Sequence, residues 1–158
     1  MSVDGSTVLF GAIPRHLEFS PEDKRALRRF AGELGRRVGG RRAFQCLITS
    51  DREMQRLNRD FLGHDYPTDV LSFPNANGHD GLGDIAVSSE RALAQAQEFG
   101  HERLDEIRIL MLHGVLHLTG MDHERDGGEM ERAEERWRNE LGLPATLIAR
   151  AAGGGRAE

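Results

Sequence analysis

The sequence predicts a single α+β domain in which one small β-sheet packs with helices. Three observations lead to this fold class. The length of 158 residues suits one domain of ordinary size. Four short strand-like runs are mixed with helical segments as far as residue 88, and the last third contains helical patterns alone. We expect the domain to span residues 1–150, with a disordered tail of small and polar residues at 151–158.

The first third of the chain predicts a strand, a helix and a second strand. An apolar run at residues 8–13 is the first strand. Ser20 followed by Pro21 and two acids is typical of a helix start, and apolar residues at helical spacing then continue to residue 38. Two glycines end that helix, and residues 44–49 form a second, buried strand.

The remaining elements follow from capping and turn signals. Ser50 and Glu53 form a capping-box pattern at the start of a helix that reaches about residue 62. Short strands are expected at residues 70–73 and 84–88, separated by a turn-rich loop. Three helices are expected after them, at residues 89–99, 102–119 and 128–141.

Composition narrows the class of protein. The single cysteine, Cys46, excludes an internal disulfide and is compatible with a reducing compartment. The first apolar run is too short for a signal peptide or a membrane span. We therefore expect a cytoplasmic protein that makes no membrane contact.

Charge is unevenly distributed along the chain. The net charge of −5 argues against a protein that coats nucleic acid through bulk charge. Residues 24–42 nevertheless carry eight basic side chains and one acid, Glu33. This stretch is interpreted first as a solvated helix face, with a phosphate-bearing partner as the alternative.

The most informative segment contains three histidines within eleven residues: His113, His117 and His123. Residues four apart on a helix lie on one face, so the first two imidazoles can reach the same ion. Gly120 can end the helix and turn the chain so that His123 returns as a third ligand. Three imidazoles suit one zinc ion per chain and leave a position for water, whose pKa zinc brings close to neutrality.

Two neighbouring observations limit this interpretation. A structural zinc usually needs a fourth protein ligand, for which Cys46 stays open as a distant candidate. The histidine spacing is that of metzincin proteases, and we expect a zincin-like metal-site helix. Gly114 stands, however, where those proteases have the glutamate that serves as general base, which argues against peptide hydrolysis.

The histidine segment with glycine at its second position resembles the YbeY family of endoribonucleases, bacterial ribosomal-RNA maturation factors. Two further segments are similar to that family: Leu57-Asn58 followed by residues 67–73, and residues 82–88. The resemblance covers about residues 57–123, with the three segments in the family's order.

This resemblance implies a mixed sheet with helices and a metal site at His113, His117 and His123. It also implies hydrolysis of single-stranded RNA, a role in 3′-end maturation of the small-subunit (16S) ribosomal RNA, and a role in ribosome quality control. Ribosomal RNA and the small ribosomal subunit are the partners it implies, whereas the oligomeric state stays open.

One position departs from the family pattern. The family commonly has an arginine after the aromatic residue of the helix that contains Asn58, and here Phe61 is followed by Leu62. Arg59 lies one turn earlier on the same face and is our candidate for a substitute catalytic cation. Asp69 and Asp84 are interpreted as turn or strand-start residues, with a direct catalytic role as the alternative.

Three functions therefore remain for comparison with the structure. The first is a metal-dependent endoribonuclease. The second is a non-catalytic ribosome-assembly factor with a structural zinc, which Leu62 favours. The third is a metal-dependent hydrolase of another substrate, such as a peptide, against which Gly114 argues.

Overall fold

The computed structural model describes residues 5–75, 81–122 and 126–144. Within these ranges the chain forms four strands and five α-helices, and the α+β fold class is confirmed. The strands are β1 (Thr7–Phe10), β2 (Phe44–Thr49), β3 (Val70–Pro74) and β4 (Gly83–Ser88). The helices are α1 (Pro21–Arg37), α2 (Asp51–Leu62), α3 (Ser89–Phe99), α4 (Arg103–Leu118) and α5 (Glu129–Leu141). The expected tail at 151–158 lies outside the described residues.

The four strands form one mixed sheet in the order β1-β2-β4-β3. β1, β2 and β4 run parallel, and β3 pairs antiparallel to β4 at the edge. The parallel strands are joined through helices, as parallel pairing requires. A mixed sheet packed with helices is what the resemblance implied.

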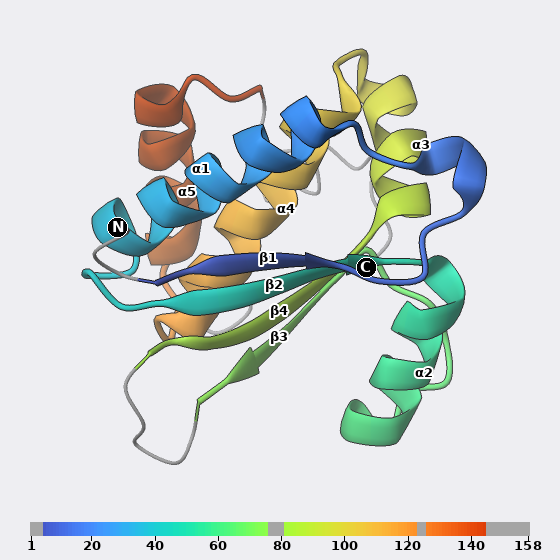
Figure 1. Ribbon diagram of the computed structural model, residues 1–158. Coiled ribbons are helices and arrows are strands. Elements are labelled where there is room, and N and C mark those ends of the chain that lie inside the picture. The colour runs from blue at the N-terminus through green and yellow to red at the C-terminus, as the bar shows by residue number, and fades with distance from the viewer. Residues whose placement is uncertain (1–4, 76–80, 123–125, 145–158) are drawn as a thin grey trace.

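The two faces of the sheet carry different helices. Successive side chains of a strand point to opposite faces, so Ser72 and Leu71 of β3 face the two sides of the sheet. The Ser72 hydroxyl bonds the Gly114 carbonyl of α4 at 3.3 Å, whereas Leu71 packs with Met54 of α2. Figure 1 shows α1, α4 and α5 on one side of the sheet and α2 on the other.

Helix α4 runs through the core between the sheet and three other helices. It contacts β3, β4, α1, α3 and α5. Side chains on all sides of it are consequently buried, including the consecutive Leu110, Met111 and Leu112. A helix that is apolar around its circumference is typical of such a central position. This packing fixes the position of the histidines near its C-terminal end.

Helix starts agree with the capping signals, with one difference in detail. The Ser20 and Ser50 hydroxyls accept backbone hydrogen bonds at the starts of α1 and α2. The Glu53 carboxylate, however, bonds the Thr49 hydroxyl at 2.6 Å and Arg56 at 2.9 Å, and no bond to the Ser50 N–H completes the box. Those two bonds hold the pKa of Glu53 below its ordinary value.

The first strand is shorter than the apolar run predicted. β1 ends at Phe10 rather than at residue 13, and a 3₁₀ turn (Arg15–Leu17) follows that no sequence signal predicted. The backbone at Gly11 lies close to Thr49, so that a Cβ atom there would be 2.8 Å from the Thr49 hydroxyl. The same hydroxyl accepts a bond from the Ala12 N–H at 3.2 Å, so the chain leaves the sheet there.

No described helix is long and apolar enough to cross a membrane.

Candidate metal site

His113 and His117 lie in the last turns of α4 and face each other, as their spacing predicts. Their ring centroids are 4.7 Å apart and the ring planes are inclined at 76°. The two Nε2 atoms are 3.1 Å apart. In each ring the other nitrogen, Nδ1, has its own hydrogen-bond partner, which determines where the ring hydrogen lies.

His117 is oriented by the turn that follows the helix. Its Nδ1 donates to the Met121 carbonyl at 2.9 Å. A carbonyl can only accept, so the hydrogen of the neutral ring lies on Nδ1 and the lone pair on Nε2. The turn depends on Gly120, whose φ of +103° is costly for residues with a side chain. The predicted role of Gly120 as the helix terminator is confirmed.

His113 is oriented by an acid that the sequence analysis did not find. Its Nδ1 bonds Oε2 of Glu134 in α5. The Glu134 carboxylate is 1% exposed, and its other oxygen, Oε1, has no hydrogen-bond partner among the described residues. With the carboxylate oxygen as acceptor, Nδ1 donates, and in the neutral ring the His113 lone pair also lies on Nε2.

Two lone pairs therefore face each other across 3.1 Å, an arrangement that is repulsive unless a cation lies between them. Two nitrogens that each lie about 2.0–2.1 Å from one tetrahedral zinc ion are separated by about 3.3 Å. The observed separation is close to that value. The tautomers and the distance both fit a shared metal ion.

The third predicted ligand, His123, lies outside the described residues. Among residues 5–75, 81–122 and 126–144, no group of three His, Cys, Asp or Glu side chains is arranged to hold a metal ion. Cys46 does not complete the site, because it is buried in β2 and burial raises the pKa of its thiol to about 12. A metal-binding thiolate needs the opposite shift.

Gly114 has a packing reason for being glycine. A Cβ atom there would lie 3.0 Å from both Cδ1 and Cγ2 of Ile85 in β4. A side chain at this position would crowd Ile85, which would have to shift by a few tenths of an ångström to admit it. A glutamate at this position, as in metzincin proteases, would meet the same crowding.

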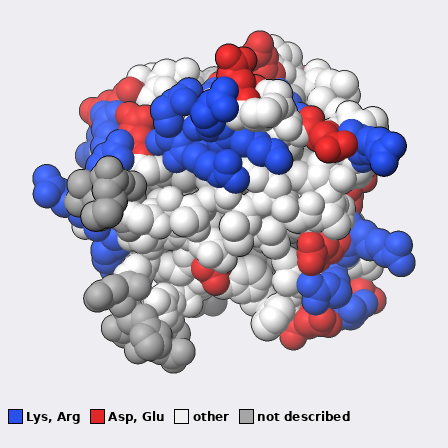
Figure 2. All heavy atoms as spheres, viewed as in Figure 1, with Lys and Arg blue, Asp and Glu red and all other residues white. Residues whose placement is uncertain are grey.

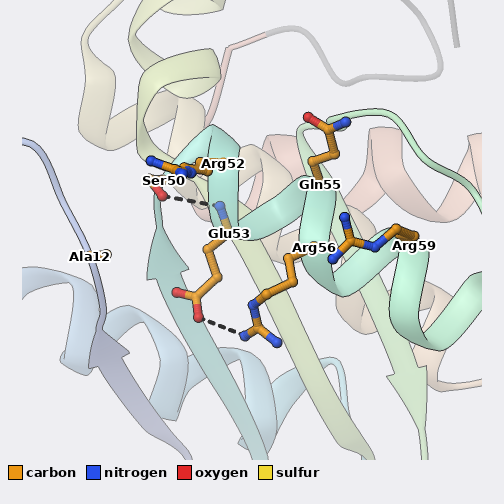
Figure 3. Close-up of a pocket in the computed structure, with 7 residues that line it drawn as sticks. All are labelled: Ala12, Ser50, Arg52, Glu53, Gln55, Arg56 and Arg59. Atoms are coloured by element: carbon orange, nitrogen blue, oxygen red, sulfur yellow. Dashed lines mark hydrogen bonds and ion pairs between the residues drawn. The ribbon is translucent and has the colours of Figure 1, made fainter.

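Arg59, the candidate catalytic cation, lies on α2, across the sheet from α4. It is exposed and forms an ion pair with Asp60 at 3.1 Å. A hollow of about 540 Å³ adjoins it, and Figure 3 shows Arg56 and Arg59 extending from the same helix. The residues lining this hollow are Ala12, Ser50, Arg52, Glu53, Gln55, Arg56 and Arg59. Arg59 is thus an ion-paired surface arginine that shares this hollow with Arg52 and Arg56.

Leu62 is also on the surface. It is 45% exposed, and the neighbouring Phe61 is 66% exposed with its ring edge against Phe73 at 6.0 Å between centroids. A second hollow, of about 310 Å³, lies between α2 and the sheet. Its lining is mainly apolar: Gln45, Leu47, Leu57, Phe61, Phe73, Asp84, Ile85 and Ala86.

The remaining candidates have mostly structural surroundings. Asp69 is buried, its carboxylate accepts from the Gln95 amide at 3.1 Å, and its carbonyl accepts from the Ser88 N–H at 3.0 Å. These bonds join the start of β3 to β4 and α3, in agreement with a turn role. Asp84 is exposed on β4 at the apolar hollow. Asp69 is therefore a buried, hydrogen-bonded residue, whereas Asp84 is an exposed residue beside a hollow.

The basic stretch at 24–42 forms the outer surface of α1 and the turn after it. Figure 2 shows Lys and Arg side chains gathered over α1. Lys24 and Arg28 lie over the Phe10 ring at 5.0 and 5.4 Å from its centroid, while Arg37 pairs with Glu33 at 2.8 Å. Most of these basic residues are exposed, and they lie on a different helix from the histidines; a phosphate-bearing partner for them stays a prediction.

Glu134 is the functional candidate that sequence reasoning missed. A weak signal existed, because Glu134 lies four residues after Met130 and so on the buried face of α5. A carboxylate on a buried face needs a partner. The partner lies 21 residues away in sequence, and local spacing could not identify it.

Comparison with known proteins agrees with this architecture. The family model described as Endoribonuclease YbeY matches residues 22–142. A protein of Solibacter usitatus named endoribonuclease YbeY is 54% identical over 149 residues, which cover 94% of this chain and 97% of the relative. One of Koribacter versatilis with the same name is 48% identical over 80% of this chain and 83% of its own. The solution structure of TM1509 from Thermotoga maritima matches with a TM-score of 0.57 and 26% identity, over 85% of this chain and 88% of that one.

Proposed function

The chain belongs to the YbeY family, and we propose that it is a zinc-dependent endoribonuclease acting on single-stranded RNA. Its curated relatives are named as endoribonucleases. We further propose that it acts in the cytoplasm, in 3′-end maturation of small-subunit (16S) ribosomal RNA and in ribosome quality control. The ribosomal RNA and the small subunit would be its partners.

The observation that supports zinc is the pair of Nε2 atoms 3.1 Å apart, each with its Nδ1 hydrogen already donated. His113, His117 and His123 would hold one ion per chain. When bound, zinc supplies a Lewis acid for phosphodiester hydrolysis. Gly114 leaves the site without a protease base, which favours RNA over peptide as the substrate.

Arg59 is proposed to steady the charge of the RNA phosphate. Its pair with Asp60 is exposed, so exchanging that partner for a phosphate costs little. Arg52 and Arg56 line the same hollow, where Glu53 offsets part of their positive charge. Guanidinium groups bind phosphate through two parallel hydrogen bonds, which suits this role.

The test uses the intact protein and a His117→Ala variant, each assayed for zinc content and for cleavage of single-stranded RNA, duplex RNA and a peptide. We expect about one zinc per parent chain, as suits one three-histidine site, and metal-dependent cutting of single strands alone. The variant should lose both zinc and cleavage. Zinc content unchanged in the variant would refute the ligand set, and peptide cleavage that depends on these histidines would refute the substrate class.

Leu62 favours a second candidate function, a non-catalytic ribosome-assembly factor with a structural zinc. The residue places an exposed apolar side chain where the family commonly has arginine. Comparing Arg59→Ala and Leu62→Arg with the parent at matched salt separates the two functions. The nuclease proposal expects Arg59→Ala to keep zinc but lose much of the cleavage rate, and Leu62→Arg in the Arg59→Ala background to restore it. A parent that binds ribosomal particles without cutting RNA would establish the assembly factor instead.

A further inference from the structure

We propose that Glu134 is a positioning residue that strengthens zinc binding by holding the His113 ring and its lone pair toward the metal. The inference rests on the proposed zinc site. It adds a residue from α5, a helix that contributes none of the three proposed ligands.

The burial of Glu134 is the first argument. The carboxylate is 1% exposed, and among the described residues no Lys or Arg side chain forms an ion pair with it. Its Oε1 has no hydrogen-bond partner there either. A buried carboxylate supported by a single bond costs several kcal/mol relative to an apolar side chain. A residue retained at such a cost needs a compensating cation nearby.

The geometry shows where that cation belongs. Glu134 accepts from His113 Nδ1, so the carboxylate and the Nε2 lone pair lie at opposite sides of one imidazole ring. With a metal ion held at Nε2, electrons would be drawn from the ring and the Nδ1–H bond to the carboxylate would be strengthened. The negative charge in turn makes the imidazole a better ligand. The two effects reinforce each other through the ring.

The second histidine of the pair is supported differently. His117 donates to the Met121 carbonyl, a neutral acceptor from the helix's own C-terminal turn. An ionised acceptor makes a hydrogen bond roughly twice as strong as a neutral one. His113 is therefore the ligand whose orientation and basicity depend on another helix. The packing of α5 against α4 becomes part of the metal site.

The experiment compares Glu134→Gln with the parent and with Glu106→Gln, a matched control at a second buried histidine–glutamate pair on α4. Glutamine keeps the shape and an acceptor but removes the charge. Zinc affinity is measured by chelator competition, and urea unfolding of the zinc-free proteins checks the fold. We expect Glu134→Gln to bind zinc roughly 10- to 100-fold more weakly, and Glu106→Gln to bind like the parent.

Cobalt substitution gives a readout that depends on ligand geometry rather than on stability. The visible absorption of bound Co²⁺ should shift in Glu134→Gln and stay unchanged in Glu106→Gln. If Glu134→Gln does not fold without metal, Glu134→Asp, which keeps the charge, is measured in its place and should retain most of the affinity that Glu134→Ala loses.

The outcomes distinguish a failure of the Glu134 proposal from a failure of the proposed zinc site. A parent that binds no zinc would refute the metal site itself. A parent that binds zinc, together with a folded Glu134→Gln variant of equal affinity and an unchanged cobalt spectrum, would refute the role of Glu134 alone. An equal loss in Glu106→Gln would show that general destabilisation, rather than positioning, controls the affinity.

Discussion

Two buried histidine–glutamate pairs stand at opposite ends of α4, and they differ in what surrounds the imidazole. At the N-terminal end, His101 Nε2 lies 2.6 Å from Oε1 of the fully buried Glu106. At the C-terminal end, His113 Nδ1 bonds the equally buried Glu134. The first pair spans five residues and joins the turn after α3 to α4. The second spans 21 residues and joins α4 to α5.

The difference lies in the nitrogen that does not face the carboxylate. In His113 that nitrogen is Nε2, and it faces Nε2 of His117 at 3.1 Å. Among the described residues, no second histidine faces the His101 ring. A buried histidine–carboxylate pair is thus a structural contact by default. It becomes a candidate metal site when its remaining nitrogen converges with another ligand.

The largest expected effect tests that distinction on zinc binding. His113→Ala removes a proposed ligand and should lower zinc affinity by more than about 100-fold, beyond what loss of a hydrogen-bond partner causes. His101→Ala should retain the affinity of the parent. Chelator competition on both variants is the measurement. Similar losses in the two variants would mean that the ends of α4 do not differ in the way proposed.

The second prediction concerns stability at the other end. His101→Ala leaves the Glu106 carboxylate buried without its imidazole, and we expect the free energy of unfolding to fall by about 3 kcal/mol. Urea unfolding measures it, and the fall should be the same with and without zinc. Replacing both residues by leucine should recover part of the loss, because no buried charge then remains. A change below about 0.5 kcal/mol would indicate a surface-like pair.

The histidine pair, the turn at Gly120 and the helix caps could be predicted from the sequence. The pairing of His113 with His117 follows from helical spacing, and the position of Gly120 predicts the turn that orients His117. These are local relations, and the structure agrees with them. The N-terminal caps of α1 and α2 were predictable for the same reason.

The parts that could not be predicted depend on distant residues. Glu134 meets His113 through helix packing, which the pattern of α5 alone does not specify. The strand order depends on which strands become neighbours. The early end of β1, beside Thr49 of β2, depends on the same pairing. The helical spacing of Arg59 places it near Leu62, but it does not say that α2 covers the sheet face opposite α4.

The third prediction tests how closely the metal-site end of α4 is held to the sheet. Gly114→Ala would bring a methyl group within 3.0 Å of Ile85, and overpacking costs about 1–3 kcal/mol. The helix preference of alanine returns close to 1 kcal/mol, so we expect a net loss of about 1 kcal/mol. In an Ile85→Ala background the loss should disappear, which a double-mutant cycle by urea unfolding measures. An equal loss in both backgrounds would show that Ile85 is not the obstacle.

The last prediction concerns a third buried ionisable group, Cys46, whose thiol pKa is raised by burial. Burial raises the pKa of its thiol in the folded protein from 9.0 to about 12, while the unfolded chain keeps the ordinary value. The folded state therefore binds the proton more tightly. This contribution to stability is fully present below pH 9 and is lost as the pH rises toward 12.

Between pH 8 and pH 10 the free energy of unfolding should fall by about 1 kcal/mol more in the parent than in Cys46→Ala. Urea unfolding at both pH values measures this difference, in which the other titrating groups cancel. Parallel pH profiles in the two proteins would mean that the thiol ionises as readily in the core as in the unfolded chain. The core would then be more polar around Cys46 than its complete burial implies.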